Sequence, residues 1–165
     1  MKLRKLQAGE TAGSYIIDSP VTETDILRMA RQLASRRVAR GKPLTDPLLV
    51  AEHLQTLLQD YEHEVFALLL LDSKNRVIDF REVFRGTIDT TRIYPREVAK
   101  TALKHNAAAV ILVHNHPSGD PEPSQADRDL TRLLKAALDL VGTRTLDHIV
   151  VGHEGFVSMA QQGYL

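Results

Sequence analysis

Two apolar runs constrain what this chain of 165 residues can fold into. Residues 65–71 read VFALLLL and are followed by the turn residues 73–75, so this run is too short for a core helix and predicts a buried strand. Residues 107–113 read AAAVILV and are apolar on both faces. Such a run is typical of a central strand with helices packed on either side of the sheet.

The remaining elements follow from periodicity and turn residues. Residues 76–86 alternate between two faces, which predicts a hairpin with the first apolar run. Residues 145–159 supply two further strand candidates joined by a turn at 152–155. Helices are expected from Pro47, capped by Asp46, to about Tyr61, from Pro95 to about Asn106, and from Ser124 to about Val141. The order predicts an α/β fold, a single-domain mixed β-sheet flanked by helices.

The N-terminal part carries an uneven charge. The chain has 21 Lys and Arg against 21 Asp and Glu, so its net field offers no general attraction to nucleic acid. Residues 26–43, however, hold six basic side chains and no acidic one, with apolar residues at helical spacing. Thr22 or Thr24 can cap this helix and Gly41 can end it. Two interpretations stay open: a docked helix with solvated arginines, or a surface from Arg28 to Lys42 that contacts nucleic acid weakly.

Composition excludes several kinds of site. Cysteine is absent, which removes disulfides, thiolate nucleophiles and Cys-type zinc sites, so any metal must be held by nitrogen and oxygen. No apolar run approaches the ~18 residues of a membrane span. The first ten residues lack the features of a secretory signal, so we expect a cytoplasmic protein with no membrane contact.

The densest chemical signal is HNHPSGDPEPSQAD, from His114 to Asp127. Two histidines at i and i+2 of a strand project from one face, so His114 and His116 can both reach one ion. Ser124 and Asp127 follow a proline-rich loop, and Asp127 in a first helical turn can supply an oxygen ligand. Two histidines and one carboxylate with an open fourth position are typical of catalytic zinc. Ser124 and Asp127 also fit a helix capping box, and that reading of the pair stays open.

These four residues reproduce H-x-H-x7-S-x2-D, and the chain therefore resembles the JAMM (MPN-plus) metalloproteases. HNHPSGDPEPSQAD, FRGTIDTTRIYPREVAKTALKHN and LDHIVVG make it more closely similar to the RadC family, especially short prophage-type members. The resemblance covers about residues 46–165, which we assign to a RadC/JAMM domain, with residues 1–45 as an N-terminal extension. It implies a three-layer architecture like that of cytidine deaminases, and a catalytic glutamate upstream of the histidines.

The alternation of residues 76–86 nominates Glu82, because it places this acid on one face with Ile78, Phe80 and Phe84. The resemblance gives it the same catalytic role, whereas a salt bridge to Arg85 or Arg96 is the alternative. Glu64 and Glu97 are weaker rivals. We expect Glu82 to act as general base and Ser124 to stabilise an oxyanion beside zinc held by His114, His116 and Asp127.

Two functions then compete. One is a zinc-dependent hydrolase of peptide or isopeptide bonds, with a peptide or protein substrate. The other is a DNA-associated protein of the RadC kind whose metal site is structural or vestigial. A zinc nucleoside deaminase would need a cysteine pair that this chain lacks. Asn115 is expected to brace the strand end. For Asp147 and His148, in the LDHIVVG segment, two roles stay open: ordinary polar strand residues, or hydrogen-bonding support for a ligand histidine.

Overall fold

The computed structural model describes residues 6–12, 14–44, 46–86 and 93–165. The helices are α1 (Glu23–Arg37), α2 (Pro47–Leu58), α3 (Pro95–Lys104) and α4 (Gln125–Leu140). The strands are β1 (Leu6–Ala8), β2 (Tyr15–Ile17), β3 (Val65–Leu71), β4 (Val77–Arg85), β5 (Ala109–Asn115), β6 (Arg144–Gly152) and β7 (Gly155–Ser158). Within these ranges, no helix combines the length and the apolar character needed to cross a bilayer.

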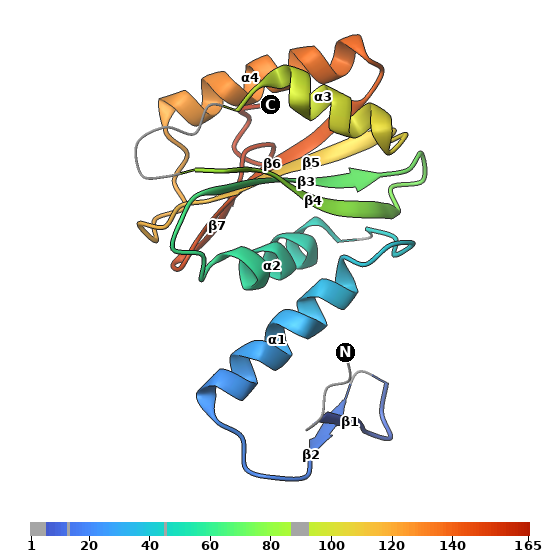
Figure 1. Cartoon of the computed structure of the whole chain (residues 1–165), viewed down its shortest axis with the longest axis vertical. Coiled ribbons are helices and arrows are strands. Elements are labelled where there is room, and N and C mark those ends of the chain that lie inside the picture. The colour runs from blue at the N-terminus through green and yellow to red at the C-terminus, as the bar shows by residue number, and fades with distance from the viewer. Residues whose placement is uncertain (1–5, 13, 45, 87–92) are drawn as a thin grey trace.

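A five-stranded mixed sheet forms the centre of the fold, in the order β4-β3-β5-β6-β7 (Figure 1). All its neighbouring strands are antiparallel except β5 and β6, which run parallel and are joined through α4. In Figure 1, α3 and α4 cover one face of the sheet and α2 covers the other. The predicted mixed sheet flanked by helices is therefore confirmed.

The two central strands have apolar side chains on both faces, as their composition requires. β3 and β5 are buried over their whole lengths. On one face, their side chains pack against α2: Ala67, Leu69, Ile111 and Val113 meet Leu54 and Leu58. On the other, they pack against α3 and α4: Leu68, Leu70, Val110 and Leu112 meet Val98, Leu134 and Leu138. Because alternate residues of a strand share a face, His114 follows Val110 and Leu112 on the side of α4.

The N-terminal part differs in detail from its prediction. Thr22 caps α1 in a capping box with Asp25, but the helix ends at Arg37, before Gly41. The hairpin of β1 and β2 was not expected from the sequence. In Figure 1, this hairpin and α1 extend away from the sheet beyond α2. An ion pair of 2.5 Å between Arg31 and Asp60 connects α1 to the segment that follows α2.

β4 is irregular, and this changes which side chains share a face. Its register with β3 shifts twice, between Phe66 and Ala67 and between Leu70 and Leu71 of the partner strand. Each shift inserts an extra residue, which reverses the alternation of faces beyond it. Ile78 and Phe84 consequently pack on the side of α3 and α4, whereas Phe80 packs on the side of α2. The prediction that these three side chains share one face with Glu82 is wrong.

Candidate metal centre

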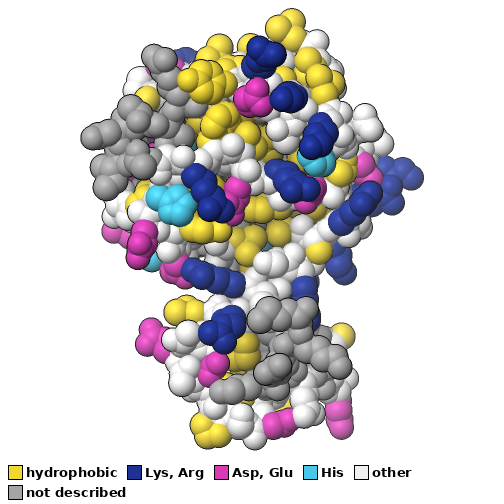
Figure 2. Space-filling view, viewed as in Figure 1, with side chains coloured by type: hydrophobic (Ala, Val, Ile, Leu, Met, Phe, Trp, Pro, Cys, Tyr) yellow, Lys and Arg dark blue, Asp and Glu magenta, His cyan; other side chains and the backbone are white. Residues whose placement is uncertain are grey.

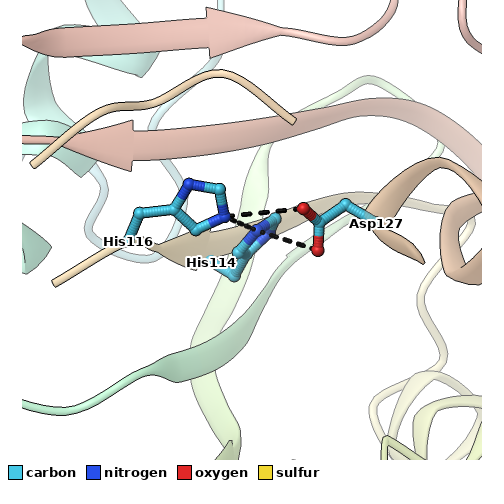
Figure 3. A group of neighbouring side chains, drawn as sticks. All are labelled: His114, His116 and Asp127. Carbon is cyan, nitrogen blue, oxygen red and sulfur yellow. Dashed lines mark hydrogen bonds and ion pairs between the residues drawn. The ribbon is translucent and has the colours of Figure 1, made fainter. Parts of the chain in front are cut away.

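The end of β5 and the start of α4 bring three ligating groups together (Figure 3). His114 is the penultimate residue of β5, His116 follows the strand, and Asp127 lies in the first turn of α4. The two Nε2 atoms are 3.0 Å apart. Each lies 3.5 Å from an Asp127 carboxylate oxygen, His114 from Oδ1 and His116 from Oδ2. The sequence prediction that these three residues face one another is confirmed.

The donor set fits a metal ion. Nδ1 of His116 lies 2.8 Å from the Asp120 carbonyl oxygen, which can only accept, so this nitrogen carries a proton. In neutral His116 the Nε2 lone pair is therefore bare and points at the other ligands. Tetrahedral ligands about 2.0–2.1 Å from one ion are roughly 3.3 Å from each other, close to the separations seen here. A cation between these atoms would relieve the repulsion of their lone pairs.

Burial and charge shift the pKa values of His114 and His116 in opposite directions. His114 is 2% exposed, and burial lowers its pKa to about 4, so the ring is neutral at pH 7. His116 is more accessible, and its hydrogen bond to Asp127 raises its pKa above the ordinary value. Neutral His114 can coordinate a metal directly. At a pH below the pKa of His116 that ring is protonated, and it must lose its proton before it can bind a metal.

Asp127 is held by the cap of its own helix. Ser124 is the N-cap of α4, and its backbone N–H and hydroxyl donate to Asp127 Oδ2 at 2.8 and 2.5 Å. Its Oγ in turn accepts from the Asp127 N–H at 3.1 Å. Partial burial raises the pKa of Asp127, but His116, His114 and Ser124 outweigh it and hold the pKa well below its usual range. The capping box therefore holds the carboxylate of Asp127, the one residue that it shares with the candidate metal centre.

Glu82 does not join this group. It pairs in register with Ala67, whose side chain packs on the face of α2, opposite to His114. Its carboxylate accepts a hydrogen bond of 2.8 Å from Tyr61 and forms an ion pair of 2.5 Å with Arg85. The salt bridge weighed as the alternative for this residue is the arrangement that the structure shows. The register shift in β4 is the physical reason, because it separates Glu82 from Phe84.

Glu64, the residue before β3, lies beside the metal ligands instead. Burial raises the pKa of this half-buried carboxyl, the negative charge of Asp127 raises it further, and His116 lowers it. Within the described ranges its carboxylate has no hydrogen bond or ion pair. The sequence named Glu64 only as a weaker rival, because nothing in its local pattern shows that the start of β3 adjoins the end of β5.

Asn115 fixes the backbone around Glu64. Its Oδ1 accepts from the Val65 N–H at 2.7 Å, and its Nδ2 donates to the His63 carbonyl oxygen at 3.1 Å. The Glu64 carbonyl oxygen also accepts from the Gly86 N–H at 2.8 Å. The two Asn115 bonds hold His63 and Val65, on either side of Glu64, to the strand that carries His114, and the third bond joins Glu64 to the end of β4. The expectation that Asn115 braces the strand end is confirmed.

Comparisons with known proteins agree with this geometry. Residues 44–164 match the RadC-like JAB domain family. A UPF0758 protein of Vibrio cholerae is 50% identical over 151 residues, which are 92% of this chain and 95% of that protein. A UPF0758 protein of Aeromonas hydrophila is 52% identical over 140 residues, which are 85% of this chain and 62% of that longer protein. The chain, with its two histidines and one aspartate facing one another at the end of β5, belongs to the RadC-like JAB domain family.

Proposed function

We propose that this protein is a zinc-dependent hydrolase of peptide or isopeptide bonds. Its family, the JAB-domain proteins, includes metalloproteases. The observation that carries the proposal is the convergence of His114, His116 and Asp127 with a carboxyl group, Glu64, that has no partner of its own in the described part of the chain. Three ligands and a separate carboxylate are the groups that metal-assisted hydrolysis requires.

Zinc would be held by Nε2 of His114, Nε2 of His116 and the Asp127 carboxylate. Nitrogen and oxygen donors of this number suit Zn²⁺ with one position open. When bound, the ion polarises a carbonyl group and lowers the pKa of water to about 7. The side chains of His116 and Asp127 are 19% and 16% exposed, so the group opens to solvent on one side. Substrate can therefore approach the site without unfolding of the sheet.

Glu64 would move the proton. Its carboxylate accepts a proton from the attacking water and then delivers it to the nitrogen of the leaving amine. Without metal, burial and the nearby charge of Asp127 raise the pKa of Glu64, the direction that favours uptake of a proton by this carboxylate. In the structure the Ser124 hydroxyl donates to Asp127. Ser124 keeps its expected role of oxyanion donor if that hydroxyl turns toward the substrate carbonyl.

The test compares two isosteric changes on opposite faces of the sheet. Glu64→Gln removes the proposed general base, and Glu82→Gln makes the same chemical change where Tyr61 and Arg85 bind the carboxylate. Hydrolysis of a degenerate peptide library and of an isopeptide-linked peptide is measured on zinc-loaded protein. We expect kcat to fall by about 10²–10⁴-fold in Glu64→Gln, with bound zinc unchanged, and to stay within a few fold in Glu82→Gln.

Two results would overturn the proposal. Equal turnover by Glu64→Gln and the unchanged protein would remove Glu64 as the base. An absence of hydrolysis by the zinc-loaded protein on both classes of amide substrate would remove the hydrolase itself. Zinc content, measured by atomic absorption on each sample, separates a loss of chemistry from a loss of metal.

A second candidate function, contact with nucleic acid, is favoured by one surface near α1. A groove of about 720 Å³ between α1 and α2 has in its lining, beside apolar side chains and the acidic Asp46, the basic residues Arg36, Arg37 and Lys42. Together with Arg40, these side chains have no ion pair among the residues that the structure describes. Figure 2 shows Lys and Arg side chains around the junction between the N-terminal part and the sheet. We propose that phosphate groups bind there, independently of the metal centre.

A further inference from the structure

A chain of buried polar groups leads from His114 into the interior of the protein. His114 Nδ1 lies 2.8 Å from Nε2 of His148, which comes from the neighbouring strand β6. His148 Nδ1 lies 2.6 Å from the hydroxyl of Thr131 in α4. That hydroxyl lies 2.6 Å from the carbonyl oxygen of Asp127, one helical turn earlier. His148, for which the sequence leaves open both an ordinary polar role and support of a ligand histidine, thus connects one proposed metal ligand to the helix that carries another.

The positions of the protons along this chain follow from its last acceptor. Two oxygen atoms only 2.6 Å apart need a proton between them, and the Asp127 carbonyl oxygen cannot donate, so the single Thr131 hydroxyl proton points to Asp127. The sulfur of Met159, 3.5 Å from the same hydroxyl, is a weaker acceptor. The Thr131 oxygen then accepts from His148, whose proton must be on Nδ1. Nε2 of His148 is consequently bare and accepts from Nδ1–H of His114. This leaves Nε2 of His114, which faces His116 and Asp127, with a free lone pair.

We propose that Thr131, acting through His148, is a positioning residue that holds His114 in the tautomer whose Nε2 coordinates the metal. The inference rests on the metal centre of the proposed function but not on hydrolysis. Metal-binding histidines need one ring nitrogen bare, and a fixed partner on the other nitrogen raises metal affinity. The reverse tautomer would place a proton between His114 and the ion, and it would also leave two bare nitrogens of His114 and His148 facing each other.

The surroundings leave little freedom for another arrangement. His114, His148 and Thr131 are at most 2% exposed, so water does not replace the bonds of the chain. Phe66 packs against both rings, with its centroid 6.3 Å from that of His114 and 5.5 Å from that of His148. The two rings therefore keep their orientation, and the tautomer is decided by hydrogen bonding. Of the three side chains in this hydrogen-bonded chain, Thr131 is the one that can be substituted while both histidine rings stay unchanged.

The experiment uses Thr131→Val, which removes the hydroxyl at nearly constant shape, and Thr131→Ser, which keeps it. Long-range ¹⁵N NMR spectra of the metal-free protein report which ring nitrogen of each histidine carries the proton. Zinc affinity is measured by competition with a chromophoric chelator. We expect protons on Nδ1 of both His114 and His148 in the unchanged protein. Thr131→Val should mix the His148 tautomers and weaken zinc binding by about 10-fold or more, whereas Thr131→Ser should restore both.

The outcomes separate this inference from the proposed function. A proton on Nε2 of His148 in the unchanged protein overturns the inference, and that measurement does not depend on how Thr131→Val folds. Zinc affinity equal in Thr131→Val and the unchanged protein also overturns it, while the metal centre stands. Absence of zinc binding by the unchanged protein removes the metal centre on which both rest. Zinc binding with the expected tautomers but without amide hydrolysis supports the inference and overturns the hydrolase.

Discussion

Zinc should stabilise the folded protein through Asp127, and Asp127→Asn is the change that tests this most directly. The substitution keeps the shape of the side chain but replaces a charged ligand by a neutral amide. A ligand present at 100 times its Kd stabilises the native state by about 2.7 kcal/mol. For a domain of this size, 1 kcal/mol shifts Tm by roughly 2–4 °C, so zinc should raise Tm by about 5–11 °C.

The expected loss in the variant follows from the ligand count. Removal of a group that only supports a ligand weakens metal affinity by roughly 10–100-fold, so removal of one ligand of three should cost at least about 100-fold. At the same zinc concentration the ratio of ligand to Kd falls to about 1, and the stabilisation falls to about 0.4 kcal/mol. The zinc-induced shift in Tm should then be about 1–2 °C.

The assay is thermal unfolding, followed by circular dichroism, of EDTA-treated protein with and without zinc. Asp127→Asn also loses charge-assisted bonds from Ser124, worth about 1.5–3 kcal/mol, so the quantity compared is the zinc-induced shift and not Tm itself. Asp129→Asn is the matched control, since it makes the same charge change on α4 at a side chain that is 58% exposed. A zinc-induced shift in Asp127→Asn as large as in the control would refute the assignment of Asp127 as a ligand.

Two further predictions concern pH and salt. In the metal-free protein His116 has a raised pKa, whereas His114, with a pKa of about 4, is already neutral, so zinc displaces one proton at mildly acidic pH. Zinc affinity, measured by competition with a chelator between about pH 5 and 6, should therefore rise about 10-fold per pH unit, and a slope of two protons would contradict the neutrality of His114. For the basic surface near α1, we expect that the unchanged protein binds a DNA duplex and that its affinity falls steeply with salt, as measured by fluorescence anisotropy. A triple variant with Ala at Arg36, Arg37 and Arg40 should abolish this binding. Undetectable or salt-insensitive binding by the unchanged protein would end the nucleic-acid proposal.

Much of the metal centre could be read from local sequence, because local geometry decides it. The i and i+2 spacing of His114 and His116 follows from the pleat at the end of β5. Asp127 and Ser124 are held by a capping box, which needs only the first turn of one helix. The apolar runs of β3 and β5 likewise predicted the centre of the sheet, since a strand buried on both faces has few alternatives.

The choice of Glu64 over Glu82 as the proposed general base depended on tertiary structure. A regular strand would place Glu82 on one face with Phe84, and the register shift beside Val83 moves the Glu82 side chain to the opposite face. The shift arises from the pairing of β4 with β3, which a pattern of polar and apolar residues does not encode. Glu64 lies near the candidate metal ligands because β3 pairs with β5, and Asn115 fixes the backbone beside it.

The contact between His148 and His114 is likewise not encoded in the local sequence pattern. It lies 34 residues after His114, and the two meet because α4 carries the chain across the sheet so that β6 pairs parallel to β5. A lone histidine within an apolar strand has no periodic signal that identifies its neighbour. The sequence alone therefore determined the candidate ligands, which are set by a strand end and a helix cap. Only the tertiary structure determined which groups lie around these candidate ligands, because strand pairing and register bring Glu64 and His148 to them from distant segments.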